Sequence, residues 1–293
     1  MISCRLRSIV ILQNIICNDF NNVVINATSD LLKNVPQQHN FSCNIPLNAN
    51  SFFLIPVTVG EVLDIISKLK NKISAGYDEI SSRLLKKCAD ELAVPLCHIV
   101  NNSFKYGVFP DDLKLALVKP LHKKGDVSLL ENYRPISITS TFSKVFEVAM
   151  CTRLLRFFYT EKLLSSSQHG YLKGRSVETA VYDFVDRILE GFEDGNLSLG
   201  IFLDLSKAFD SLNHDILIEK LERYGVRGPA VAWIRSYLTN RRQKVVLNRN
   251  GEQFSSDEGT LQQGTPQGSV IGPLLFIFYV NNVAEDILDQ NSR

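Results

Sequence analysis

The sequence predicts an α+β fold in which helices dominate the first half and antiparallel strands come late. Three observations support this. Apolar residues recur at helical spacing after Thr58, a short continuous apolar run covers Gly200–Leu203, and two strand-like runs flank Asn250-Gly251. The chain has 293 residues, of which 45% are hydrophobic and 22% charged, so it can build a sizeable core and does not have a disordered composition.

Residues 1–55 are expected to form a linker or a loosely packed lead-in. Asn, Gln and Ser are frequent from residue 18 onward, and no periodicity is sustained. Arg5 and Arg7 precede the apolar run Ser8–Ile16, which is similar to the core of a signal peptide, but polar residues interrupt it and no cleavage site follows. We therefore expect an amphipathic or buried element there.

Helices are predicted from residue 58 onward. Thr58 and Glu61 have the spacing of a capping box, and apolar residues follow at intervals of three and four. Two further helical stretches are expected at about 81–106 and 143–159.

The period changes after residue 199. Gly200–Leu203 is typical of a strand covered on both faces, and it ends in Asp204. The remaining predicted elements are a helix with a left-handed C-cap at Gly225, a helix opening at Gly228-Pro229, a hairpin of Lys244–Leu247 with Gln253–Ser255, and an apolar helix ending near Val283.

Composition narrows the function classes. The 32 Lys and Arg residues nearly balance 31 Asp and Glu, so no global field attracts a polyanion, and any such binding must use local clusters. The longest apolar run, Pro273–Val280, is far shorter than the roughly 18 residues of a membrane span, so we expect no membrane partner. The six cysteines include no C-x-x-C pair, which disfavours a zinc site. An even number of cysteines is weak evidence for disulfides in a chain this long, so we expect buried, reduced thiols in an intracellular protein. We expect it in the nucleus, the cytoplasm or both.

Asp204 is the sharpest candidate for chemistry. An acid at the end of an apolar strand is costly to bury unless a cation or hydrogen-bond donors compensate it. Phe209 and Asp210 follow five and six residues later. Spacing alone leaves two interpretations open, a metal ligand or the commoner capping or salt-bridged aspartate.

Four blocks in one order resemble the reverse transcriptases of non-LTR (LINE-type) retrotransposons, closest to the jockey-like group. Group II intron enzymes are the nearest alternative. The blocks are Lys119–Asp126 with Asn132–Ser137, then Gln168–Ser176, then Phe202–Asp210, then Gly264–Ser269 followed by Gly272–Phe276.

The resemblance implies a right-hand polymerase fold, with a fingers-like region over 56–198 and a partial palm over 199–293. It implies RNA-directed DNA polymerase activity, in which deoxynucleotides are added to a primer 3′-hydroxyl with two Mg²⁺ ions. The implied partners are an RNA template, a DNA primer and deoxynucleoside triphosphates; no oligomeric state follows from it.

The resemblance also assigns roles to residues. Asp204 would be the catalytic metal ligand, with the Leu205 carbonyl beside it. Phe209 would exclude the ribose 2′-hydroxyl, and Asp210 would tie strand to helix. The nucleotide-binding residues would be Lys123 and Arg134 on the triphosphate, and Gln267 and Gly268 in the loop against the incoming nucleotide.

Each assignment has a plainer alternative. Lys123 could be a solvated charge, and Pro-Gln-Gly an ordinary turn. Basic clusters could contact template and primer phosphates, although each is more often a solvated face. These clusters are Lys119/Lys123/Lys124, Lys173/Arg175 and Arg241/Arg242/Lys244.

The sequence differs from the family's pattern at one motif. The aromatic-x-Asp-Asp hairpin, which supplies further metal carboxylates, does not follow Val283. Phe109-Pro110-Asp111-Asp112 precedes Asp204 and is predicted to be a turn leading into a helix. We therefore expect the isolated chain to be inactive. The alternative functions are a non-catalytic RNA- or DNA-binding protein derived from the element, or an unstable relic.

Overall fold

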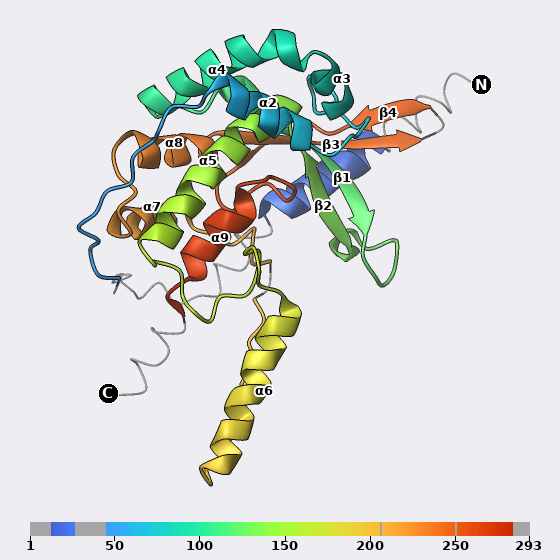
Figure 1. The fold of residues 1–293 in the computed structure, drawn as a ribbon. Helices are drawn as coiled ribbons and strands as arrows, with labels where there is room; N and C mark the ends of the chain where they lie inside the picture. Colours follow the sequence, from blue (N-terminus) through green and yellow to red (C-terminus); the bar gives the residue numbers. More distant parts are fainter. Residues whose placement is uncertain (1–12, 27–44, 206, 250, 284–293) are drawn as a thin grey trace.

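The computed structural model describes residues 13–26, 45–205, 207–249 and 251–283, which form a mixed α+β structure (Figure 1). No helix within these ranges is long and apolar enough to cross a membrane. The elements in chain order are α2 (Val59–Lys68), α3 (Ser82–Lys87), α4 (Ala89–Tyr106), η1 (Asp111–Leu113), β1 (Leu115–His122), η2 (Leu130–Asn132), β2 (Tyr133–Ile138), α5 (Thr141–Thr160), α6 (Val177–Glu193), α7 (His214–Arg223), α8 (Pro229–Leu238), β3 (Arg241–Arg249), β4 (Glu252–Ser255), β5 (Gly259–Leu261) and α9 (Gly272–Val280).

The main core lies among the helices. Phe109 is fully buried, and its ring packs edge-on against Phe146 of α5 and against Trp233 and Tyr237 of α8, with centroids 5.0 to 5.9 Å apart. Trp233 donates its indole N–H to the hydroxyl of Ser103 in α4 at 2.8 Å. This aromatic cluster joins α4, α5 and α8. Its large rings bury much apolar surface, and the bond to Ser103 satisfies the indole N–H, which needs a polar partner when buried.

Local signals place most helix boundaries. Thr58 caps α2, since its hydroxyl accepts from the Glu61 N–H at 3.1 Å, which confirms the predicted start. Gly225 follows α7 with φ of +101°, the left-handed conformation expected there. The stretch predicted at 81–106 is two helices rather than one, because Cys88 (φ −109°, ψ 23°) breaks it.

The sheet has the strand order β2-β1-β3-β4, with β5 also paired to β3. β1 and β3 run parallel, and the other pairs are antiparallel. The predicted hairpin is confirmed, since Leu247 pairs with Phe254 and Gly251 lies in the turn with φ of +85°. Asn250, its other turn residue, lies outside the described residues.

The β1–β2 hairpin was not predicted, because each strand contains a proline. Pro120 lies opposite Pro135 in the register. The Ser137 N–H, two residues further along β2, donates away from the hairpin to the Gln267 carbonyl. Alternate residues of an antiparallel strand turn their N–H groups to the same side, so the nitrogen of Pro135 also faces away from β1. Pro120 and Pro135 therefore form a non-hydrogen-bonded pair, in which neither residue needs a backbone N–H donor. The expectation that strands come only late is therefore wrong.

A helical segment at residues 13–26 covers one face of this sheet. Cys17 and Phe20 are buried against Val118 of β1 and Val245 of β3. The expected lead-in over 1–55 therefore contains an ordered, packed helix. The amphipathic or buried element expected at Ser8–Ile16 overlaps the start of this helix, whereas residues 18–26 were expected to be loosely packed because polar residues are frequent there.

Gly200–Leu203 is not a strand, contrary to prediction. Phe202 is 82% exposed and Leu203 76% exposed, and no described strand pairs with them. The run instead follows α6, where the Phe202 ring lies 5.5 Å from that of Phe184. α6 projects from the helical body, and none of its residues is buried (Figure 1). A strand requires a neighbouring backbone as well as an apolar sequence, and no described strand supplies one here.

Candidate functional site

A cavity of about 690 Å³ lies between the β1–β2 hairpin and the loop that precedes α9. Six of the eight residues to which the resemblance assigns roles line it, although they are spread over 123–268. They are Lys123, Arg134, Phe209, Asp210, Gln267 and Gly268. The fold thus brings together residues that the resemblance had selected one by one.

The hairpin forms the cationic wall of this cavity. Arg134 lies opposite Leu121 in the register, and the Lys123 N–H closes the end of the hairpin by donating to the Asn132 carbonyl at 2.9 Å. Both cationic side chains are exposed, and neither forms an ion pair with another described residue. They can therefore contact an anionic ligand without first breaking a protein ion pair.

The loop 264–271 forms the facing wall, and it packs tightly on β2. The Gln267 carbonyl accepts from the Ser137 N–H at 2.8 Å. Gly268 has φ of +120°, and a Cβ added there would lie 2.7 Å from the Ser137 carbonyl oxygen. Only glycine fits this close approach without displacing backbone.

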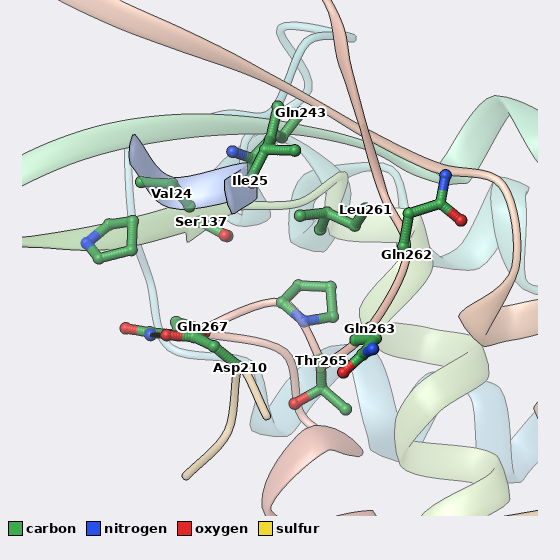
Figure 2. Close-up of a pocket in the computed structure, with 12 residues that line it drawn as sticks. Val24, Ile25, Ser137, Asp210, Gln243, Leu261, Gln262, Gln263, Thr265 and Gln267 are labelled. Atoms are coloured by element: carbon green, nitrogen blue, oxygen red, sulfur yellow. Dashed lines mark hydrogen bonds between the residues drawn. The ribbon is translucent and has the colours of Figure 1, made fainter. Parts of the chain in front are cut away.

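The Gln267 side chain is held by the carboxylate of Asp210. Its amide nitrogen donates to both carboxylate oxygens of Asp210, at 2.9 and 3.0 Å. Figure 2 shows the pair at the edge of a smaller cavity, of about 50 Å³, that Val24 and Ile25 also line. Both partners line both cavities, as do Pro135, Thr265 and Pro266, so the two cavities share this part of their walls.

Burial raises the pKa of Asp210 above its usual range, although the Gln267 hydrogen bonds and nearby Lys207 act in the opposite direction. The carboxylate is thus a desolvated group whose partner is neutral. The predicted role for Asp210, tying strand to helix, differs from this contact with the loop, because the expected strand is absent.

The turn containing Phe209 and the loop are one hydrogen-bonded unit. The Phe209 carbonyl accepts from the Thr265 N–H at 3.1 Å, and the His214 ring nitrogen Nε2 lies 2.8 Å from the Gly264 carbonyl. Burial lowers the pKa of His214, although the contact with Gly264 raises it. The Phe209 ring packs 4.9 Å from that of Phe276 in α9.

Sequence reasoning missed other residues of the cavity wall, notably Tyr171, Lys207 and Ser269. Each belongs to or adjoins a block that had been recognised, but nothing in its spacing distinguished it. The Tyr171 ring lies edge-on to that of Phe209 with centroids 6.0 Å apart, a contact across 38 residues that has no local signature.

Asp204 and Leu205 do not join this site. Both are exposed, lie in a segment without a strand, and do not line the cavity. The prediction of Asp204 at a strand end is therefore wrong for this structure. No group of three or more His, Cys, Asp or Glu side chains among the described residues could hold a metal ion. Those residues do not fit a two-Mg²⁺ site, since Mg²⁺ needs several oxygen ligands.

Two other sequence features have structural roles. Asp111 lies in η1 directly after Pro110 and pairs with Lys114 at 2.7 Å, which confirms the predicted turn. Arg241, placed in a basic cluster, is 1% exposed and stacks over the Tyr237 ring, so it cannot reach a phosphate on the surface. By contrast, Lys119 and Lys124 are exposed on and beside β1.

Comparisons with known proteins agree on one family. The family described as "Reverse transcriptase (RNA-dependent DNA polymerase)" matches residues 121–292. The "Probable RNA-directed DNA polymerase from transposon BS" of Drosophila melanogaster is 32% identical over 75% of this chain and 24% of its own length. The "RNA-directed DNA polymerase from mobile element jockey" of the same species is 28% identical over 83% of this chain and 25% of its own length. The chain thus spans about a quarter of the length of these relatives.

Proposed function

The chain belongs to the reverse transcriptase (RNA-dependent DNA polymerase) family, in its jockey-like non-LTR retrotransposon group, and we propose that its large cavity binds the incoming deoxynucleoside triphosphate of RNA-templated DNA synthesis. One observation carries the proposal. Residues from three separate blocks, Lys123 with Arg134, Phe209, and Gln267 with Gly268, line one cavity of about 690 Å³. A cavity of this size suits a small-molecule ligand.

The two walls suit the two ends of a nucleotide. Arg134 and Lys123 would contact the triphosphate, with the guanidinium offering two parallel donors to phosphate oxygens. The opposite wall, formed by the Gln267-Gly268 backbone and the Phe209 ring, would contact the sugar and base. Phe209 would then exclude a 2′-hydroxyl by occupying its space.

We assign residues 56–198 to a fingers-like region and 199–293 to a partial palm. The β1–β2 hairpin, with its free cationic side chains, supports the first assignment. Template and primer would lie along the exposed lysines Lys119 and Lys124. Phosphoryl transfer in polymerases uses two Mg²⁺ ions, and because the described residues do not fit that pair, the proposal for this chain concerns nucleotide binding.

The test is a titration of the 293-residue chain with dTTP and Mg²⁺, followed by calorimetry. Arg134→Ala should weaken binding by about tenfold or more, since a charge-assisted bidentate contact is lost, while the melting temperature stays constant. Arg156→Ala is the matched control, because Arg156 is an exposed arginine of α5 outside the cavity. Equal affinity in the parent and Arg134→Ala, or equal weakening in both variants, would contradict the proposal.

A non-catalytic nucleic-acid-binding role is the second candidate, and the exposed Lys119 of β1 and Lys124 beside it favour it. The dTTP titration, together with a titration of an RNA duplex, distinguishes the two functions. A purely nucleic-acid-binding protein would bind the RNA duplex in a salt-dependent way but show no saturable dTTP binding.

A further inference from the structure

Glu147 is a fully buried carboxylate near the middle of α5 whose partners are supplied mainly by a distant segment. Its Oε2 accepts from the Val270 N–H at 2.6 Å and from the Ile271 N–H at 3.2 Å. Its Oε1 accepts from the Ser143 hydroxyl at 2.6 Å. Burial of a carboxylate is unfavourable unless donors compensate it, and here three donors do so.

The two backbone donors lie where α9 begins. Ile271 is the N-cap residue of α9, and its side chain makes no capping hydrogen bond. The first N–H groups of a helix have no partner within it, and the helix dipole favours a negative charge at that end. Glu147 therefore binds the N-cap N–H of α9 and the N–H before it, although it belongs to α5, 124 residues earlier in the chain, while the Ser269 hydroxyl accepts from the Gly272 N–H at 3.1 Å.

The same contact ends the loop that carries Gln267 and Gly268. Upstream, the Gly264 N–H donates to the Leu212 carbonyl, and in the middle Gln267 is bound to Ser137 and Asp210. Val270 follows Ser269 directly, so the bonds from Glu147 fix the downstream end. Glu147 itself does not line the cavity.

We propose that Glu147 is a positioning residue, which holds the Gln267–Ser269 loop in its nucleotide-facing position without touching the nucleotide. The nucleotide part of this inference rests on the proposed function above. The plain alternative is that Glu147 only stabilises the fold as a whole. The two differ in locality, because a positioning residue affects the loop and the cavity far more than the rest of the core.

Hydrogen exchange without nucleotide tests the anchoring. Glu147→Gln keeps the shape but offers a weaker, neutral acceptor, and Leu154→Ala removes a fully buried side chain of the same helix that does not line the cavity. The two variants are compared at denaturant concentrations where they have equal stability. There we expect the 264–272 backbone of Glu147→Gln to exchange about tenfold faster than that of Leu154→Ala. Equal acceleration in the two variants would overturn the inference.

Nucleotide titration tests the consequence. Glu147→Gln should weaken dTTP binding in the presence of Mg²⁺ by about tenfold relative to Leu154→Ala at matched stability. If the loop loosens but affinity is equal in the two variants, the positioning role is wrong. If the parent binds no dTTP, the proposed function fails, while the exchange result still decides whether Glu147 anchors the loop.

A milder variant covers the case in which Glu147→Gln does not fold. Ser143→Ala removes only the donor to Oε1 and leaves both backbone bonds of Glu147 in place. It should loosen 264–272 in the same direction but by less, because the carboxylate loses one orienting partner. Exchange identical to that of the parent would overturn the inference.

Discussion

Gln267 donates its side-chain amide to both carboxylate oxygens of Asp210, at 2.9 and 3.0 Å, across 57 residues of sequence. The pair joins the loop before α9 to the turn that carries Phe209. It therefore links the two segments that make the wall opposite Arg134 and Lys123, and stability measurements at this pair report on the wall directly.

Asp210→Asn should remove the part of the pH dependence of the unfolding free energy that comes from the titration of Asp210. The native state holds the Asp210 proton more tightly than the unfolded state, because burial raises its pKa from the usual 3.8. The unfolding free energy of the parent therefore falls as pH rises from about 3.8 through the raised pKa, relative to the variant. Asparagine keeps one acceptor for Gln267, so the fold should persist.

Urea unfolding of parent and variant between pH 3.5 and 7 measures this difference. Asp186→Asn, which changes an exposed acid of α6, is the control. A parent that gains stability over Asp210→Asn with rising pH would show that the sign is wrong.

Gly268→Ala should destabilise the protein by about 1 to 3 kcal/mol, because both the positive φ and the contact with Ser137 resist a Cβ. Gly174→Ala is a matched control, since Gly174 also has positive φ (+79°) but nothing lies within 4 Å of an added Cβ. Chemical unfolding should show the larger loss for Gly268→Ala. Equal losses would mean that the loop does not pack closely on β2.

Phe202→Lys should reduce self-association without lowering the melting temperature. Phe202 is 82% exposed and adjoins other exposed apolar side chains of 197–205 and α6, and such patches favour aggregation. Light scattering during heating measures the effect. Asn196→Lys adds the same charge at an exposed polar residue nearby, so an equal improvement there would attribute the effect to charge alone.

Elements with local signals were predictable. The Thr58 cap, the left-handed Gly225 and the turn at Gly251 are each determined by residues close in sequence, and all appear in the structure. The strands β1 and β2 were not, because the prolines Pro120 and Pro135 are tolerated only through their mutual register. The prediction of a strand at Gly200–Leu203 was wrong, because a strand-like composition is not sufficient: no described strand pairs with this run.

The candidate site divides in the same way. Resemblance selected Lys123, Arg134, Phe209, Gln267 and Gly268, and the fold brings them into one cavity. The contacts that support them were invisible in the sequence. Glu147 reaches Val270 across 123 residues, and the Asp210 carboxylate reaches Gln267 across 57, so neither pairing has a local pattern.

The central claim is that the cavity between the β1–β2 hairpin and the loop before α9 receives the nucleotide. Photolabelling of the chain with 8-azido-dATP, followed by peptide mapping, tests it most directly. A second cavity, of about 640 Å³ and lined by Phe53, Arg156 and Phe157, offers an internal comparison of similar size. Because the azido group lies on the base, we predict adducts in peptides covering 207–210 and 265–273, the wall opposite Arg134 and Lys123, that unlabelled dATP suppresses. Suppressible adducts confined to the second cavity, or labelling that dATP does not suppress, would contradict the account.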